Sequence, residues 1–270
     1  MNRAQSIVLW VAVSVLAVFA AAAVAPALFA THDPLLTDVR AALLPPGPEH
    51  LFGTDQSGRD VYSRVVYGAG RSIGIGLLAT GIALVVGLLI GSVAGVAPRY
   101  VDIALMRVND VLMAFPEFLV ALVVVALLGP GPVNIAVAVT LAAVPVYVRL
   151  ARVQTRRLVI AEHVEAARIL GVGPVAAFVR HVAPGVLGAL SVLATIGIGS
   201  SILAAAGLSF LGLGPSEPTP EWGLMLAGGR NVLGQAWWIS VFPGAAITLT
   251  VVASTVVGRI LRARAEGRRP

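Results

Sequence analysis

Long apolar runs without a charged side chain constrain this chain more than any other feature. Five runs contain no Asp, Glu, Lys or Arg, and a sixth carries only three charged residues. A helix of roughly 20 apolar residues crosses the hydrocarbon core of a bilayer, and backbone polar groups in lipid must be satisfied within the segment. The sequence therefore predicts an all-α integral membrane protein with six transmembrane helices. These are expected over residues 7–30, 72–98, 103–128, 133–148, 186–208 and 239–257.

The first run has two interpretations. A cleaved signal peptide is one, because the small residues Ala25-Pro26-Ala27 lie near its end. However, the run over 7–30 is longer than the apolar core of about 7–15 residues that a signal peptide carries. The length favours a first transmembrane helix that is retained.

Composition excludes several functions. Charged residues make up 12% of the chain, against about 25% in a soluble domain. Cysteine is absent and all 19 basic residues are arginine, so the chain has neither thiolate chemistry nor the lysine of a phosphate-binding P-loop. If ATP drives this protein, ATP and Mg²⁺ must be bound by a partner, and we expect no cofactor on this chain. The arginines flank apolar spans, which favours lipid headgroups over nucleic acid as their partners.

The arginines also predict the orientation. With six spans, both termini and the loops near residues 99–107 and 149–184 share one side of the membrane. Fourteen of the 19 arginines lie there, which the positive-inside rule assigns to the cytoplasm. They are Arg3, Arg99, Arg107, Arg149, Arg152, Arg156, Arg157, Arg168, Arg180, Arg259, Arg262, Arg264, Arg268 and Arg269.

The stretch from 162 to 184 is the longest amphipathic segment outside the apolar runs. Its first part places Ala166, Ile169, Leu170 and Gly173 on one face of a helix. Gly171 and Gly173 then interrupt the pattern, and Pro174 suits the first turn of a second helix. Larger residues at the same spacing follow in the second part, at 175, 178, 179 and 182. We predict a helix, a glycine turn and a second helix. The small residues of the first helix would let a partner approach closely, and the large residues of the second would anchor the unit to its own protein. The alternative is a surface hairpin that only caps the bundle.

Charged residues near the spans are further candidates. Asp55, Arg59 and Asp60 flank a turn-prone Ser-Gly; they could bind a cation or an anion, but we favour a salt-bridged turn. Arg107 and Asp110 are three residues apart and are expected to pair on a helix. Glu117 lies deeper in the third span, and intramembrane acids are often functional.

Two further features lie in the second span and the second outer loop. Gly87, Gly91 and Gly95 share a helix face at a spacing that lets transmembrane helices pack closely. Glu217, Glu221 and Trp222 lie in the loop over 209–234, on the side where a substrate would enter; an interfacial aromatic anchor is the alternative for Trp222, and for the tryptophans at 237 and 238.

Glu165-Ala166-Ala167, followed by Gly171 and later by Pro184, resembles the EAA loop of bacterial ATP-binding-cassette (ABC) importer permeases. Three other stretches resemble the peptide and nickel branch of that family. These are FGTDQSGRDVYSRVVYG at 52–68, MRVNDVLMAFPEF at 106–118, and LSFLGLG with PTPEWG at 208–223. Ala183 and Gly185 depart from the pattern, where Leu and Asn are common, and are expected to loosen the second helix of the loop without changing its Glu-Ala-Ala-x3-Gly core.

The resemblance implies a type I ABC importer permease core with a cytoplasmic coupling helix, in the bacterial inner membrane. Residues 1–70 would form the first helix and an external linker, 71–262 the core with its coupling loop over 157–184, and 263–270 a cytoplasmic tail. Glu165, Ala166, Ala167, Arg168, Gly171 and Pro184 would contact the ATPase, and Glu117, Glu217, Glu221 and Trp222 the pathway or a binding protein.

The implied partners are a second, homologous permease, two ATPase subunits or one fused ATPase, an extracytoplasmic solute-binding protein and membrane lipid. The cargo would be short peptides, with nickel or a metal chelate as the alternative. An intramembrane enzyme is excluded because no histidine lies in a span and no HExxH or GxSxG motif occurs. A stand-alone secondary transporter would need mid-membrane charges that five of the six spans lack.

Overall fold

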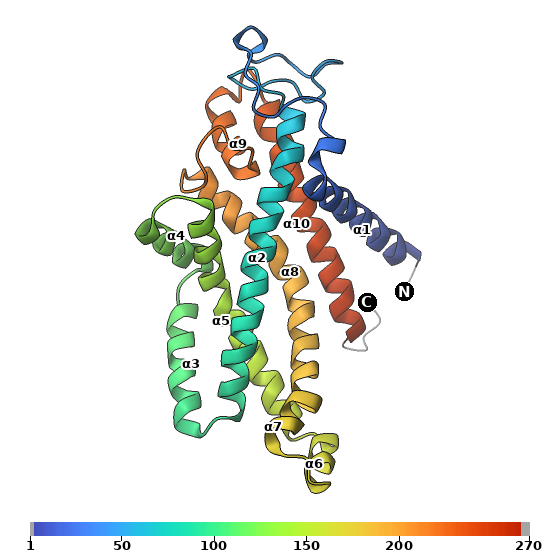
Figure 1. Cartoon of the computed structure of the whole chain (residues 1–270), viewed down its shortest axis with the longest axis vertical. Coiled ribbons are helices and arrows are strands. Elements are labelled where there is room, and N and C mark those ends of the chain that lie inside the picture. Colours follow the sequence, from blue (N-terminus) through green and yellow to red (C-terminus); the bar gives the residue numbers. More distant parts are fainter. Residues whose placement is uncertain (1–2, 266–270) are drawn as a thin grey trace.

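A computed structural model describes residues 3–265 and is helical throughout its transmembrane part (Figure 1). In the described chain the only β-type pairing is an isolated bridge between Thr54 and Asp60. The main helices are α1 (Arg3–Val24), α2 (Val61–Val96), α3 (Arg99–Met113), α4 (Glu117–Leu128), α5 (Pro132–Val159), α6 (Glu162–Ile169), α7 (Pro174–Ala177), α8 (Ala183–Phe210), α9 (Trp222–Gly229) and α10 (Trp238–Ala265). Residues 266–270, most of the expected tail over 263–270, lie outside the described residues.

Five helical segments are long and apolar enough to cross a membrane, and a sixth span is possible if a bent pair counts as one. That pair is α3 and α4, which meet at an angle of 90°. Pro116 caps α4, and a proline disfavours helical geometry in the residue before it. The all-α membrane fold is therefore confirmed, and the third expected span, over 103–128, consists of two helices that meet at this bend.

The second span starts earlier than expected, at Val61 instead of Ser72. The Asp60 carboxylate caps α2 by accepting a hydrogen bond from the backbone N–H of Ser63 at 2.7 Å. With 36 residues, α2 is roughly 54 Å long, which exceeds a hydrocarbon core of about 30 Å. The second half of the 52–68 block is therefore helical, and α2 is long enough to project from the bilayer.

The glycine face of α2 packs against α5, as the spacing predicted. A Cβ added to Gly87 would lie 2.3 Å from the Cβ of Tyr147, and one added to Gly91 would lie 2.4 Å from the backbone oxygen of Val148. At Gly95 the nearest atom would be a methyl of Thr155, at 2.6 Å. The two helices are thus in backbone contact along this face.

At the end of the molecule drawn uppermost in Figure 1, the loops fold into a packed cap. The second outer loop contains α9, and the linker over 31–60 lies beside it. Trp222 and Trp238 are buried there, and their indole N–H groups donate to the carbonyls of Val65 and Thr54 at 2.9 and 3.0 Å. These two tryptophans are core residues and not interfacial anchors; Trp237 is half exposed.

Candidate functional site

Residues 162–182 form a projection, here called the helical tip, at the end of the molecule opposite the linker (Figure 1). It consists of α6, a glycine turn, α7 and a π-helical turn over Phe178–Val182 that leads directly into α8. The prediction of helix, glycine turn and helix is confirmed. The second helix continues without a break into the fifth span.

One face of the helical tip is anchored in the protein. Val164 and Val182 are fully buried, and both join a core cluster with Tyr147, Ala151 and residues of α8. Ala167 is also buried, at 8% exposure. This anchoring fixes the orientation of α6 relative to the end of α5.

The other face is open. Glu165, Ala166 and Arg168 are exposed, and the apolar side chains of Ile169 and Leu170 are 80% and 84% exposed. Large apolar side chains that are exposed outside the membrane spans favour contact with a partner. The predicted stripe of small and apolar residues is therefore the free face. The predicted anchoring stripe is divided: Val175 and Val179 are exposed, whereas Phe178 and Val182 are turned inward.

The turn after α6 depends on Gly171. The backbone N–H of Val172 donates to the carbonyl of Ala167 at 3.1 Å, and the N–H of Gly171 donates to that of Arg168 at 3.0 Å. This pair of bonds is a Schellman motif, in which the residue after the helix adopts a left-handed conformation. Gly171 has φ of +87°, a value that glycine adopts without steric cost.

Two residues at the start of α8 have a structural explanation: Pro184, which ends the family pattern, and Gly185, which departs from it. Pro184 has no N–H to donate into the preceding turn, and the π-helical turn immediately before it accommodates that missing bond. Gly185 lies against Leu158, whose side chain would be 2.8 Å from an added Cβ. The glycine therefore allows α8 to approach the end of α5.

Acidic residues of α3 hold the arginine-rich end of α5 above the tip. Asp102 is buried and accepts hydrogen bonds from Arg152 and Arg156, each to Oδ2 at 2.7 Å. Asp110 pairs with Arg149 and not, as predicted, with Arg107. No local pattern indicates these pairs, because each joins residues about forty to fifty positions apart.

A cavity of about 1330 Å³ lies between α2 and α5 and extends to the loop before α9. Its lining is mostly apolar, with Leu78, Ile82 and Val137 among its residues, and Glu221 lies at one end. Glu117 begins α4 at the 90° bend; its side chain is exposed and forms no hydrogen bond or ion pair with the described residues. Glu221 therefore lines the cavity, whereas Glu117 does not.

The predicted outer site residues have structural partners. Arg59 donates to Asp55 and to Glu217, both at 2.7 Å, which confirms the salt-bridged turn. Burial opposes the charge on Arg59, but Asp55 and Glu217 together raise the pKa of its guanidinium. Glu221 is buried and caps α9, accepting from the backbone N–H groups of Gly223 and Leu224 at 2.9 and 2.8 Å.

Residues 87–269 match the family model described as "Binding-protein-dependent transport system inner membrane component". The chain is 41% identical over 233 residues to a probable D,D-dipeptide transport system permease protein, DdpC, of Escherichia coli K12, covering 86% of this chain and 78% of that protein. It is 42% identical over 212 residues to a di/tripeptide transport system permease protein, DppC, of Pseudomonas aeruginosa, covering 78% and 70%. A glutathione transport system permease protein, GsiD, of Escherichia coli O6:K15:H31 is 41% identical over 217 residues, covering 80% and 72%.

Proposed function

This chain belongs to the family of binding-protein-dependent transport system inner membrane components, and we propose that it is the permease subunit of an ATP-driven importer of short peptides. The observation that carries the proposal is the identity of about 40% over most of the chain to permeases named for dipeptide, di/tripeptide and glutathione transport. As a multi-pass permease of the inner membrane, the chain is not itself an enzyme. Its family implies a solute-binding protein and an ATPase as partners.

We assign contact with the ATPase to the helical tip. An exposed apolar surface formed by Ile169 and Leu170, next to Glu165 and Arg168, suits a groove on a soluble subunit. Ala166 lets the groove approach closely, whereas Ala167, Gly171 and Pro184 shape the tip from within. ATP and Mg²⁺ would be bound by two ATPase subunits or by one fused ATPase.

We assign the translocation pathway to the face of α2 and α5 that borders the cavity. A second, homologous permease would close this face, and the exposed apolar side chains of Leu78, Ile82 and Val137 support such a contact. Movement of the two helical tips together would then rock the spans and open the pathway to the other side of the membrane. Glu117, Glu217 and Glu221 remain predictions for contacts with cargo or with the binding protein, whereas Trp222, which is buried in the outer cap, would act by positioning the loop that carries them.

The same scheme gives the orientation. The tip and both termini would face the cytoplasm, and the linker and α9 would face outward, where the binding protein docks. The arginine-rich ends of α5 and α10 support this orientation. The segments are the first helix and linker (1–70), the core (71–262) with its coupling loop (157–184), and the tail (263–270).

The proposal is tested by identifying the ligand that copurifies with the cognate binding protein, using mass spectrometry and metal analysis. We expect peptides of two to several residues, and uptake of the same labelled peptide by vesicles that contain the complete transporter. Nickel or a metal chelate in place of peptide would overturn the substrate assignment but leave the permease role intact. Peptide uptake unaffected by deletion of this chain would overturn both.

A further inference from the structure

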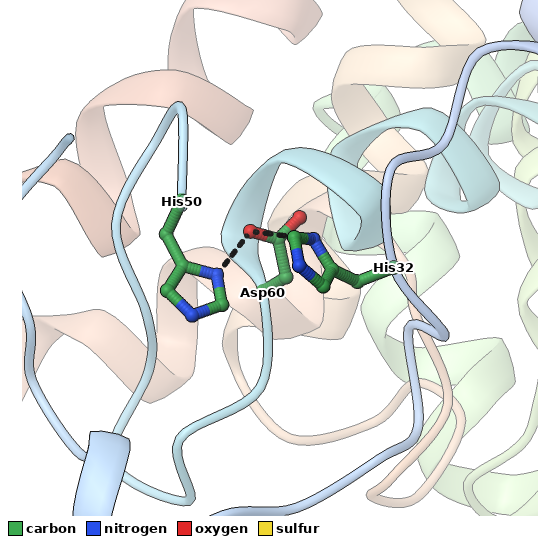
Figure 2. Close-up of side chains that lie close together, drawn as sticks. All are labelled: His32, His50 and Asp60. Atoms are coloured by element: carbon green, nitrogen blue, oxygen red, sulfur yellow. Dashed lines mark hydrogen bonds and ion pairs between the residues drawn. The ribbon is translucent and has the colours of Figure 1, made fainter. Parts of the chain in front are cut away.

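Three residues from separate segments of the outer cap meet at one point (Figure 2). His32 comes from the beginning of the linker, His50 from its later loop, and Asp60 from the residue that caps α2. Nδ1 of His50 lies 2.9 Å from Oδ1 of Asp60, and Nδ1 of His32 lies 3.8 Å from the same oxygen. One donor atom from each residue lies within 4.8 Å of the other two. Figure 2 shows the carboxylate between the two imidazole rings.

Asp60 is a buried carboxylate without an arginine partner in the described part of the chain. Its side chain is 1% exposed, yet among the described residues it forms no ion pair with an arginine. The buried carboxylates of Asp55 and Asp102 are paired with arginine, whereas that of Glu221 accepts hydrogen bonds from Ser72 and from two backbone N–H groups. Asp60 caps α2 through Oδ2, and at Oδ1 the two histidines are the groups that could donate a hydrogen bond or hold a cation.

We propose that His32, His50 and Asp60 form a binding site for one divalent transition-metal ion, for which Zn²⁺ is the best-suited probe. Two imidazole nitrogens and one carboxylate oxygen are ligands that Zn²⁺ takes at about 2.0–2.2 Å, and a tetrahedron of that size separates its ligands by roughly 3.4 Å. The separations of 2.9 and 3.8 Å from Asp60 bracket this value, and the donor atoms of the two histidines lie within 4.8 Å of each other, so side-chain rotations would bring the three ligands to this spacing. The fourth position is open to water beside His32, whose side chain is 40% exposed.

The site does not compete with the fold around it. Asp60 uses Oδ2 to cap α2 through Ser63, which leaves Oδ1 for a metal. The hydroxyl of Thr31 lies 3.0 Å from Nδ1 of His32 and 3.5 Å from Oγ of Ser63. It can therefore bond to Ser63 instead and leave Nδ1 of His32 for the metal. The metal would occupy Nδ1 of His50 in place of the hydrogen bond to Asp60, and the neutral imidazole can carry its hydrogen on Nε2 instead.

A metal here would fasten the linker. Residues 31 and 32 already donate their backbone N–H groups to Oγ of Ser63 at 3.2 and 3.0 Å, at the first turn of α2. The metal would add a bond from this segment, and from the loop at His50, to the end of the same helix. The bound ion would thus be a structural metal that holds the outer cap together, independent of which cargo the transporter carries.

The test is titration of the purified, untagged full-length chain in detergent with ZnCl₂ against a chromophoric chelator. We expect one equivalent to bind, and we expect His32→Gln and His50→Gln each to weaken binding at least tenfold, as loss of even an outer-shell partner can do. Zinc-edge X-ray absorption should report nitrogen and oxygen ligands with scattering from two imidazoles. Zn²⁺ should also raise the unfolding temperature of the wild type and not of the variants.

The chain offers a matched control. His163 and His181 also lie close together, with ring centroids 6.4 Å apart, but on the helical tip and outside the proposed site. His163→Gln with His181→Gln should leave zinc binding unchanged. Because His32→Gln alters an exposed residue, it tests the site even if His50→Gln fails to fold. Equal zinc affinity in wild type and His32→Gln, or loss of binding only in the tip variant, would overturn the proposal.

Discussion

Nη1 of Arg59 donates a hydrogen bond to Oε2 of Glu217 at 2.7 Å, across 158 positions of the chain. The same guanidinium donates through Nε to Asp55. Arg59 therefore joins the linker to the loop that precedes α9. Its two acidic partners differ in exposure, at 5% for the Asp55 side chain and 49% for that of Glu217.

This difference predicts an asymmetry between two variants. Arg59→Ala leaves the Asp55 carboxylate buried with only the more distant Arg64, and should cost about 3–5 kcal/mol of unfolding free energy. Glu217→Gln removes a half-exposed partner and should cost at most about 1 kcal/mol. Thermal unfolding in detergent measures both; equal losses would mean that the pairing with Asp55 is not what stabilises the cap.

Gly171→Asp should leave the protein in the membrane but abolish uptake. A side chain at φ of +87° costs roughly 1–2 kcal/mol locally, and the new charge falls beside the exposed face that we assign to the ATPase. Gly173→Ala is the control, because Gly173 has φ of −59° and open space around it. Normal uptake by the Gly171→Asp transporter would argue that the tip is not the coupling element.

Opposite faces of the helical tip should respond differently to the loss of an apolar side chain. Leu170→Ser changes a side chain that is 84% exposed, so it should weaken copurification of the ATPase without lowering the unfolding temperature. Val164→Ala empties a fully buried position and should cost about 1–3 kcal/mol of stability. Undiminished ATPase binding by Leu170→Ser would remove the apolar face of the tip from the interface.

Gly91→Ala should destabilise the pair of α2 and α5. Its methyl group would lie 2.4 Å from the backbone oxygen of Val148, which cannot move aside as a flexible side chain can. Overpacking of this kind costs about 1–3 kcal/mol. Gly81→Ala, in the same helix with no neighbour within 4 Å, is the control and should be neutral in an unfolding assay; equal stability of both variants would contradict close packing at Gly91.

Glu117→Gln should lower uptake while leaving the amount of protein in the membrane unchanged. The Glu117 side chain is exposed at the bend between α3 and α4 and makes no hydrogen bond to the described residues, so the fold does not require its charge. Transport is measured over a range of substrate concentrations. Unchanged uptake at every substrate concentration would mean that Glu117 has no role in transport beyond beginning α4.

Local patterns predicted much of this molecule. The length of the apolar runs predicted the spans, and Gly171 predicted the turn of the helical tip. The spacing of Gly87, Gly91 and Gly95 predicted a face of close helix packing, which is the contact of α2 with α5. The sequence did not predict contacts between distant residues: Asp110 binds Arg149 and not its helical neighbour Arg107, because the end of α5 lies beside α3. Trp222 and Trp238 also looked interfacial, since nothing local indicates that the outer loops fold into a core around them.

The helix that leaves the tip does not stop at the membrane. It is helical from Pro174 to Phe210, so its 37 residues form a rod of about 55 Å. A rod of that length works as a lever arm: a tilt of about 5° at the tip end displaces the far end by roughly 5 Å, the pitch of one helical turn. The far end reaches the loop that Arg59 holds through Glu217. A small displacement at one surface of the protein is thereby amplified at the other through one continuous helix, whose π-helical turn over Phe178–Val182 lies close to the tip end.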